Sequence, residues 1–479
     1  MLTLINTNHM QPPIAPVGLD YVAGAVRRAG LEADLVDLCL AADVDQALRE
    51  HFDQCRPDLV GLTFRNVDDC FWPSGQSFLP ELKRCVAQVR ENTDAPIVLG
   101  GVGYSIFPRE IVALTGVDFG IHGDGERATV DLLNELRGRR HFERVAGLVY
   151  HENGSLRANP PAWPRDLSIP TDRRSVDNAT YFRLGGQLGV ETKRGCARGC
   201  IYCADPLSKG KTFRVRPPAE VADEFESLLS QNINVLHLCD PEFNLPPQHA
   251  LDVCDELIAR ELAKRVRWYA YLAVTPFSAQ LARRMREAGC VGINFTSDAA
   301  HPQMLATYRQ PHREQDLARA VQLCRANGMA VMLDMLLGGP GETPETLAET
   351  IERFKQIDPD CAGAALGVRV YPGTPMAAIV AAEGPLERNA NIRRHYHGPV
   401  DLLKPTFYIS SALGHHPARM VRDLIGDDPR FFPPEEESAV AGSADPHGDH
   451  NYNANEQLVD AIAAGERGAY WDILRRLRR

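Results

Sequence analysis

Three cysteines crowd into eight residues of this chain. Cys196, Cys200 and Cys203 lie in TKRGCARGCIYC, a C-x3-C-x2-C spacing. Thiolates at this spacing on one tight loop can bind three irons of a 4Fe–4S cluster, and the missing fourth thiolate leaves one iron open to another ligand. Zinc prefers four ligands in structural sites, and this segment offers no adjacent fourth. A structural zinc loop, or three merely buried thiols, is the alternative, and a zinc protein would be colourless.

Composition excludes several other classes of protein. The other nine of the 12 cysteines are scattered singly, which does not suggest a disulfide framework in a chain of 479 residues. The formal net charge of −11 argues against a protein that grips nucleic acid. No apolar run reaches the roughly 18 residues of a membrane span, and the start, MLTLINTN, does not resemble a signal peptide. We therefore expect a cytoplasmic protein without nucleic-acid or membrane partners.

The residues before the cysteines predict a separate domain with its own ligand site. Residues 1–140 alternate short apolar segments with helical ones, which predicts an α/β domain with a doubly wound parallel, Rossmann-like sheet. Ligands bind beyond the carboxyl ends of such strands. The loops predicted at that edge carry Gly, Ser, Asn and acidic residues, and they span 8–16, 63–69, 100–108 and 123–126.

A second alternating series surrounds the cysteines. Residues 141–185 read as a hairpin and an extended linker. Six strand–helix units then follow in 186–380, which predicts a partial (β/α)6 TIM-like barrel. The pattern fades in 381–479, where we expect a small C-terminal lid whose aromatic residues cap the open barrel.

The cysteine loop after the first strand of an incomplete barrel resembles the radical S-adenosylmethionine (SAM) superfamily. The resemblance implies that the open iron binds SAM and that reduction cleaves a carbon–sulfur bond. It also implies an electron donor such as flavodoxin or ferredoxin. By resemblance to the motifs of the family, the expected SAM contacts are Tyr202, Asp240, Glu242, Asn294, Ser297, Asp298, Arg309, Gly338 and Gly339.

These positions also have simpler readings. Asp240 and Asp298 could be helix N-caps, a common role for Asp at a strand-to-helix turn. The two glycines could only make a turn, and Arg309 could be a solvated charge. Arg369 is harder to dismiss, because a buried arginine needs an anionic partner. We expect Arg369 and Tyr371 to point into the barrel mouth as catalytic residues.

The first domain resembles the cobalamin-binding domain of one large radical SAM subgroup. The resemblance implies cobalamin contacts from the four loops, at Asn8, Thr63, Arg65, Asn66, Gly101, Gly103, Tyr104, Ser105, Gly123, Gly125 and Glu126. The D-x-H-x-x-G motif of enzymes that ligate cobalt from below is absent, and His9 and His122 are the imidazoles near predicted strand ends. Either the cobalt lacks a protein ligand or the domain has lost the cofactor and only docks against the barrel.

The resemblance implies cobalamin-dependent methylation of a small-molecule biosynthetic intermediate. Cleavage of another carbon–sulfur bond of SAM would instead give 3-amino-3-carboxypropyl transfer, as proposed for the enzymes of arsinothricin biosynthesis, with trivalent arsenic as the acceptor. A corrin- or cluster-based sensor is the alternative from a different class, but the sequence shows no output module such as a DNA-reading helix pair.

Overall fold

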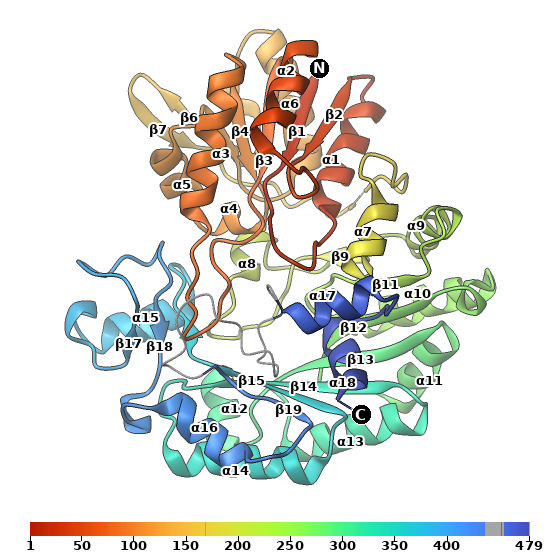
Figure 1. The fold of residues 1–479 in the computed structure, drawn as a ribbon, viewed down its shortest axis with the longest axis vertical. Coiled ribbons are helices and arrows are strands. Elements are labelled where there is room, and N and C mark those ends of the chain that lie inside the picture. Colours follow the sequence, from red (N-terminus) through yellow and green to blue (C-terminus); the bar gives the residue numbers. More distant parts are fainter. Residues whose placement is uncertain (168, 436–451, 453–454, 479) are drawn as a thin grey trace.

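The structure is a computed structural model that describes residues 1–479 except 168, 436–451, 453–454 and 479. Figure 1 shows the N-terminal sheet (red to orange) above an open barrel (green to cyan), with the short helix α8 (Asp205–Ser208) between them. Within the described part of the chain, no helix combines the length and apolar character needed to cross a membrane.

The N-terminal domain is a seven-stranded sheet in the order β2-β1-β3-β4-β5-β6-β7. The first five strands pair in parallel, and a terminal antiparallel hairpin extends the sheet. The strands are β1 (Leu2–Asn6), β2 (Ala33–Asp37), β3 (Leu59–Thr63), β4 (Ile97–Gly100), β5 (Phe119–Ile121), β6 (Leu148–Glu152) and β7 (Ser155–Ala158). Apolar side chains from the strands are buried on both faces, which confirms the doubly wound prediction.

Six helices accompany this sheet. They are α1 (Val17–Arg28), α2 (Val44–Gln54), α3 (Leu79–Asn92), α4 (Val102–Ile106), α5 (Pro108–Thr115) and α6 (Gly125–Arg137). The chain then passes through α7 (Asn178–Gly185) into the second domain. A buried charge network joins the domains there, because Arg173 of the linker pairs with Asp20 of α1 at 2.7 Å and with Glu224 of the barrel at 2.7 Å.

The barrel is a parallel sheet in the order β19-β15-β14-β13-β12-β11-β8. Its strands are β8 (Leu188–Val190), β11 (Val235–Leu238), β12 (Arg267–Ala273), β13 (Cys290–Asp298), β14 (Ala330–Leu337), β15 (Cys361–Leu366) and β19 (Phe431–Phe432). Its helices are α9 (Pro218–Ser230), α10 (Pro247–Ala259), α11 (Ala279–Glu287), α12 (Pro302–Tyr308), α13 (Glu314–Ala326), α14 (Pro344–Ile357) and α15 (Pro375–Ala382). The first six strands confirm the predicted partial barrel, and β19 was not predicted.

The sixth strand ends earlier than the sequence suggested. Gly367 has φ +89°, and this left-handed residue breaks the predicted strand after β15. Val368–Arg369 forms β16, which belongs to a small sheet in the order β16-β18-β17. The partners of β16 are β17 (Ile392–Arg393) and β18 (Phe407–Tyr408). Arg369 and Tyr371 therefore lie beyond the end of the barrel strand β15.

The C-terminal helices pack against the barrel, and one of them lies close to the N-terminal domain (Figure 1). The three helices are α16 (Pro417–Ile425), α17 (Glu456–Ala463) and α18 (Tyr470–Leu477). Trp471 of α18 meets Tyr269, near the start of β12, with ring centroids 6.0 Å apart. The C-terminal region was expected to form a small lid. Helix α17 packs against α7, beside the linker between the domains, and residues 436–451 and 453–454 of this region lie outside the described residues.

Candidate cluster and cofactor site

The three cysteines lie on a loop that is closed by a short hairpin. Strand β9 (Lys193–Arg194) leads into the loop, and β10 (Arg214–Val215) leaves it, paired antiparallel to β9. Gly195 has φ +81°, and a Cβ there would lie 2.1 Å from the carbonyl oxygen of Thr212. Only glycine therefore permits the loop to close directly before the first cysteine.

The thiols occupy a buried environment. Burial raises the pKa of the Cys196 thiol to about 11, and it also raises the pKa of Cys203, which interacts electrostatically with the other two cysteines. Glu242 lies within electrostatic range of Cys196 and Cys200, and burial raises the pKa of its carboxyl to about 7. Its Oε1 accepts a hydrogen bond from the Thr296 hydroxyl at 2.7 Å, whereas its buried Oε2 has no partner.

This donor set fits an iron–sulfur cluster better than a single ion. Among the described residues, no three His, Cys, Asp or Glu side chains converge closely enough to hold one metal ion. A cube of four irons separates its thiolates further than a single ion does, and thiolates are the ligands that such cubes prefer. Cys196, Cys200 and Cys203 would hold the cluster, and Glu242, whose Oε2 has no partner, lies within electrostatic range of Cys196 and Cys200.

A hydrogen-bond network supports the cysteine loop from the segment that follows α12. The Nε2 of Gln310 lies 3.3 Å from the sulfur of Cys200 and also donates to Asp298. Its Oε1 accepts from Arg198 at 2.6 Å. Asp298 accepts from the Tyr202 hydroxyl at 2.7 Å, so these two predicted SAM contacts bind each other. Sequence reasoning missed Gln310, although it follows the predicted Arg309, which is exposed.

Asp240 supports the base of the same loop. Its Oδ1 accepts from the backbone N–H groups of Thr192 and Lys193 at 2.8 and 3.2 Å. The Lys193 ammonium donates to the carbonyl oxygen of Phe243 at 2.9 Å, and burial lowers its pKa to about 8. Helix α10 begins only at Pro247, so Asp240 is not its N-cap. Its carboxylate instead fixes the strand that leads to the first cysteine.

Further predicted SAM residues line the ends of β13 and β14. Asn294 donates to Asp334 at 2.7 Å, and its own buried Oδ1 has no partner. The Ser297 hydroxyl donates to the carbonyl oxygen of Asp334 at 2.7 Å. Gly338 has φ +92°, and a Cβ on Gly339 would meet the Tyr308 hydroxyl at 2.2 Å. Both glycines are therefore required by the turn and its packing.

Arg369 and Tyr371 lie at the interface with the N-terminal domain. The Nε of Arg369 donates to Asp68 at 2.9 Å, and its other nitrogens donate to backbone carbonyl oxygens. The Tyr371 hydroxyl lies 2.9 Å from the sulfur of Cys70. The expected anionic partner of the buried arginine exists, but it comes from the first domain, and we do not propose a direct catalytic role for either residue.

A cavity of about 150 Å³ lies in the N-terminal domain on the side of α1 and α6. Six of the predicted cobalamin residues line it: Thr63, Gly101, Ser105, Gly123, Gly125 and Glu126. Leu4, Leu62, Val98 and Leu99 supply apolar walls. A Cβ on Gly101 would lie 2.6 Å from the carbonyl oxygen of Phe64, so the glycine keeps this rim narrow. Such a slot fits a flat aromatic group with polar substituents at its rim.

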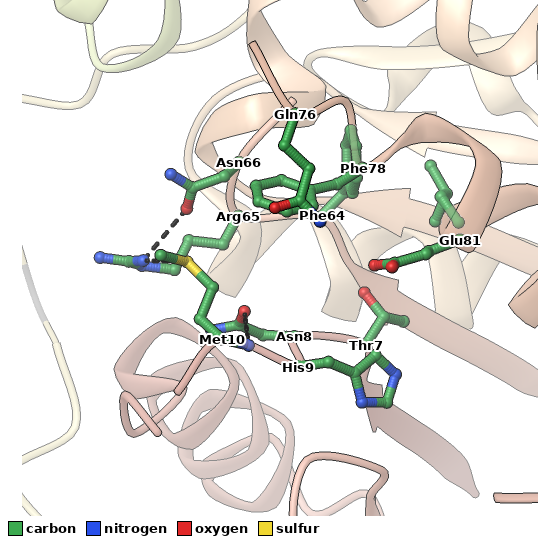
Figure 2. Close-up of a pocket in the computed structure, with 11 residues that line it drawn as sticks. Thr7, Asn8, His9, Met10, Phe64, Arg65, Asn66, Gln76, Phe78 and Glu81 are labelled. Carbon is green, nitrogen blue, oxygen red and sulfur yellow. Dashed lines mark hydrogen bonds between the residues drawn. The ribbon is translucent and has the colours of Figure 1, made fainter. Parts of the chain in front are cut away.

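A second, smaller cavity of about 80 Å³ opens beside the ends of β1 and β3. In Figure 2, Arg65 and Asn66 from the loop after β3 face Asn8 and Met10 from the loop after β1. The Nη1 of Arg65 donates to Asn66 at 3.1 Å, and the buried Nδ2 of Asn8 has no partner. The loops predicted to seat a corrin thus meet at one edge of the sheet.

Two predicted cobalamin contacts lie behind this edge. Tyr104 is fully buried in the domain core, with its hydroxyl pressed against Gly120, and Gly103 is buried against the backbone of Arg65 and Asn66. Both support the loop from within. The Nε2 of His122 lies 2.7 Å from the carbonyl oxygen of Leu207, so this nitrogen is occupied by the barrel.

Comparison with known proteins agrees with this architecture. The Radical SAM superfamily model matches residues 190–354, and the B12 binding domain model matches residues 4–133. The tryptophan 2-C-methyltransferase of Streptomyces laurentii is 33% identical over 446 residues, which cover 80% of this chain and 74% of that protein. The chain belongs to the cobalamin-dependent radical SAM methyltransferases.

Solved structures of this family share the whole architecture. The radical SAM methyltransferase TsrM from Kitasatospora setae, with tryptophan and a SAM analogue bound, superposes with a TM-score of 0.90 at 30% identity. The same enzyme with cobalamin and a [4Fe-4S] cluster gives 0.89 at 28% identity. Each match covers 99% of this chain and 97% of that chain. The cofactors of this methyltransferase are therefore a 4Fe–4S cluster, SAM and cobalamin. The alternative that the three cysteines form a structural zinc loop is thereby excluded.

Proposed function

We propose that this methyltransferase transfers a methyl group from SAM, by way of cobalamin, to a carbon of an aromatic amino acid of the tryptophan type. Two of the similar proteins act on tryptophan by name, and their likeness covers 80% and 99% of this chain. We further propose that a flavodoxin or ferredoxin supplies electrons to the cluster.

Four side chains on neighbouring barrel strands support the proposed substrate class. His237, Tyr271 and Asn294 stand on the neighbouring strands β11, β12 and β13, and Asn294 donates to Asp334 on β14. The rings of His237 and Tyr271 lie 4.9 Å apart at an angle of 57°. Aromatic rings beside a carboxylate–amide pair suit a substrate that has an aromatic body and an ammonium group.

The residues of the chain would hold and orient the reactants. In this proposal the amide oxygen of Asn294 and the carboxylate of Asp334 accept hydrogen bonds from the substrate ammonium, and His237 and Tyr271 flank its ring. Thr63, Gly101 and Ser105 line the slot for the nucleotide tail of cobalamin. When bound, the cofactors supply a methyl carrier and the electrons that maintain it. The N-terminal domain lies above the barrel (Figure 1), and enclosure of the reactants between the two domains would limit the access of water.

Analysis of the SAM-derived products tests the proposal. The reconstituted enzyme, with SAM, a reductant and L-tryptophan, should form S-adenosylhomocysteine and a singly methylated amino acid only when cobalamin is present. The C200A variant, which loses one cluster ligand, serves as the control and should form neither. Methylthioadenosine as the main product would replace this proposal with 3-amino-3-carboxypropyl transfer. Formation of S-adenosylhomocysteine without methylation of any aromatic amino acid would overturn the substrate class.

A further inference from the structure

The hairpin that closes the cysteine loop is bound to the N-terminal domain by two arginines. Arg194 on β9 and Arg214 on β10 are paired in register. Arg194 donates to both carboxylate oxygens of Glu126 at 2.9 and 2.7 Å, and Arg214 forms a bidentate pair with Asp124. Asp124 and Glu126 stand at the start of α6, so both arms of the hairpin are anchored to the same turn of the first domain.

These ion pairs are nearly excluded from solvent. The side chains of Arg194 and Glu126 are 9% and 12% exposed, and those of Arg214 and Asp124 are 2% and 14% exposed. Bidentate Arg–carboxylate pairs fix both distance and orientation. Breaking a buried pair leaves an uncompensated charge, so the position of the hairpin and that of the α6 turn are strongly linked.

The same segment forms a wall of the cofactor cavity. Arg194, Ser208 and Lys209 line the cavity of about 150 Å³ from the barrel side, facing the glycine-rich loops of the first domain. Ser208 and Lys209 follow the last cysteine, Cys203, by only a few residues. Figure 1 shows α8, which contains Ser208, between the two domains. One face of the cysteine-bearing loop therefore belongs to the cavity.

We propose that the Glu126–Arg194 pair couples the two cofactor sites, so that binding of the cluster raises the affinity for cobalamin and binding of cobalamin raises the affinity for the cluster. This inference rests on the proposed placement of cobalamin in the cavity. An assembled cluster fixes the loop, and a fixed loop completes the cavity wall. By linkage the coupling factor is the same in both directions. Glu126 is thus a positioning residue, because its carboxylate is held by Arg194.

A binding titration tests the coupling without measuring activity. The dissociation constant for hydroxocobalamin is measured by absorbance under anaerobic conditions, first with the cluster intact and then after removal of the cluster by a chelator. The quantity to compare is the ratio of the two dissociation constants. A uniform loss of cobalamin affinity changes both constants by the same factor and leaves this ratio unchanged. For the wild-type protein we expect the cluster to tighten binding by about five-fold or more.

Two substitutions on either side of Arg194 separate the link from general damage. E126Q removes the partner in the first domain, and the ratio should fall to about one because the coupling is lost. E191Q removes the other carboxylate on the same guanidinium, which lies 2.8 Å away within the barrel, and the ratio should stay near the wild-type value. If E126Q does not fold, D124N replaces it, since Asp124 anchors the other arm of the hairpin.

The possible results distinguish a failure of the coupling from a failure of the proposed function. A wild-type ratio of about one, with cobalamin bound in both states, would overturn the coupling and leave the proposed function intact. Equal loss of the ratio in E126Q and E191Q would show that the inter-domain pair is not the link. Failure of the wild-type protein to bind cobalamin in either state would remove the proposed function together with this inference.

Discussion

The guanidinium Nε of Arg369 lies 2.9 Å from the Oδ2 of Asp68, although 301 positions separate the two residues in the chain. Both side chains are buried, at 4% and 0% exposure. Asp68 belongs to the loop after β3, and Arg369 belongs to β16. The ion pair therefore joins the two domains through a long-range contact that has no local sequence signal.

Removal of Arg369 should destabilise the interface between the domains. R369M leaves the Asp68 carboxylate buried without its cation, and we expect a loss of about 3–5 kcal/mol in the free energy of unfolding. D68N leaves the Arg369 guanidinium buried without its anion, and we expect a loss of similar size. In the double variant the two losses should not add, and a double-mutant cycle from urea unfolding measures the difference. Simple additivity would contradict a direct pair.

Filling the cavity of the first domain should block cobalamin. Gly18 lines the cavity from α1, and a Cβ there meets no atom within 4 Å. G18L should therefore be tolerated by the helix, which gains about 1 kcal/mol in propensity, while the new side chain occupies the slot. Equilibrium dialysis should show at least a roughly ten-fold loss of cobalamin affinity, about 1.4 kcal/mol. R28L, at an exposed position of α1, is the matched control and should bind normally.

Gln310 should tune the cluster through its contact with Cys200. Q310L removes the hydrogen bond to the sulfur, and loss of such an outer contact commonly costs about 10-fold or more in metal affinity. The reduction potential of the cluster should also fall, since a hydrogen bond to sulfur stabilises the more negative reduced state. Iron content and a spectroscopic redox titration measure both effects. R309L is the comparison, and a larger loss there would restore the sequence-based assignment of Arg309 as the cofactor contact.

Glu342 should make stability depend on pH. This residue is 1% exposed, its Oε2 accepts from the Gly338 N–H, and burial raises its pKa from 4.5 to about 7. Between these values the folded chain holds a proton that the unfolded chain has lost. The stabilisation is complete below about pH 4.5 and is lost as the pH rises through about 7, for a change of about 3 kcal/mol.

The E342Q variant isolates this contribution because the amide mimics the protonated carboxyl. Relative to wild type, its free energy of unfolding should increase as urea titrations move from about pH 5 to about pH 8. E352Q, at an exposed position of α14, is the control and should show no such trend. A constant difference between E342Q and wild type would contradict the raised pKa of Glu342.

The sequence predicted those parts of the structure that depend on a pattern of neighbouring residues. The six parallel barrel strands follow from apolar runs separated by helical segments, and the cysteine loop follows from its spacing. The loop residues Thr63, Gly101 and Gly123 were correctly expected at one edge of the first sheet, because parallel strands end together. Whether these loop residues contact cobalamin stays a prediction.

The misses concern contacts between distant parts of the chain. Glu126 lines the cavity as expected, but its ion pair with Arg194 of the other domain has no local sequence signal. Tyr104 was expected to contact cobalamin by resemblance, yet its ring fills the core. Arg369 was expected in the mouth because one positive-φ glycine, Gly367, was not read as the end of a strand. No local pattern distinguishes these alternatives.

The seventh barrel strand has a consequence for biosynthesis. Phe431–Phe432 pairs with Ala362 and Gly363 of β15, so the last parallel edge is covered by residues that follow it by about seventy positions. During synthesis on the ribosome, the outer backbone groups of Ala362 and Gly363 stay unpaired until that dipeptide has been made. An unprotected edge of this kind invites pairing with other chains. Slow translation of the segment after β15 should therefore promote aggregation of the newly made protein.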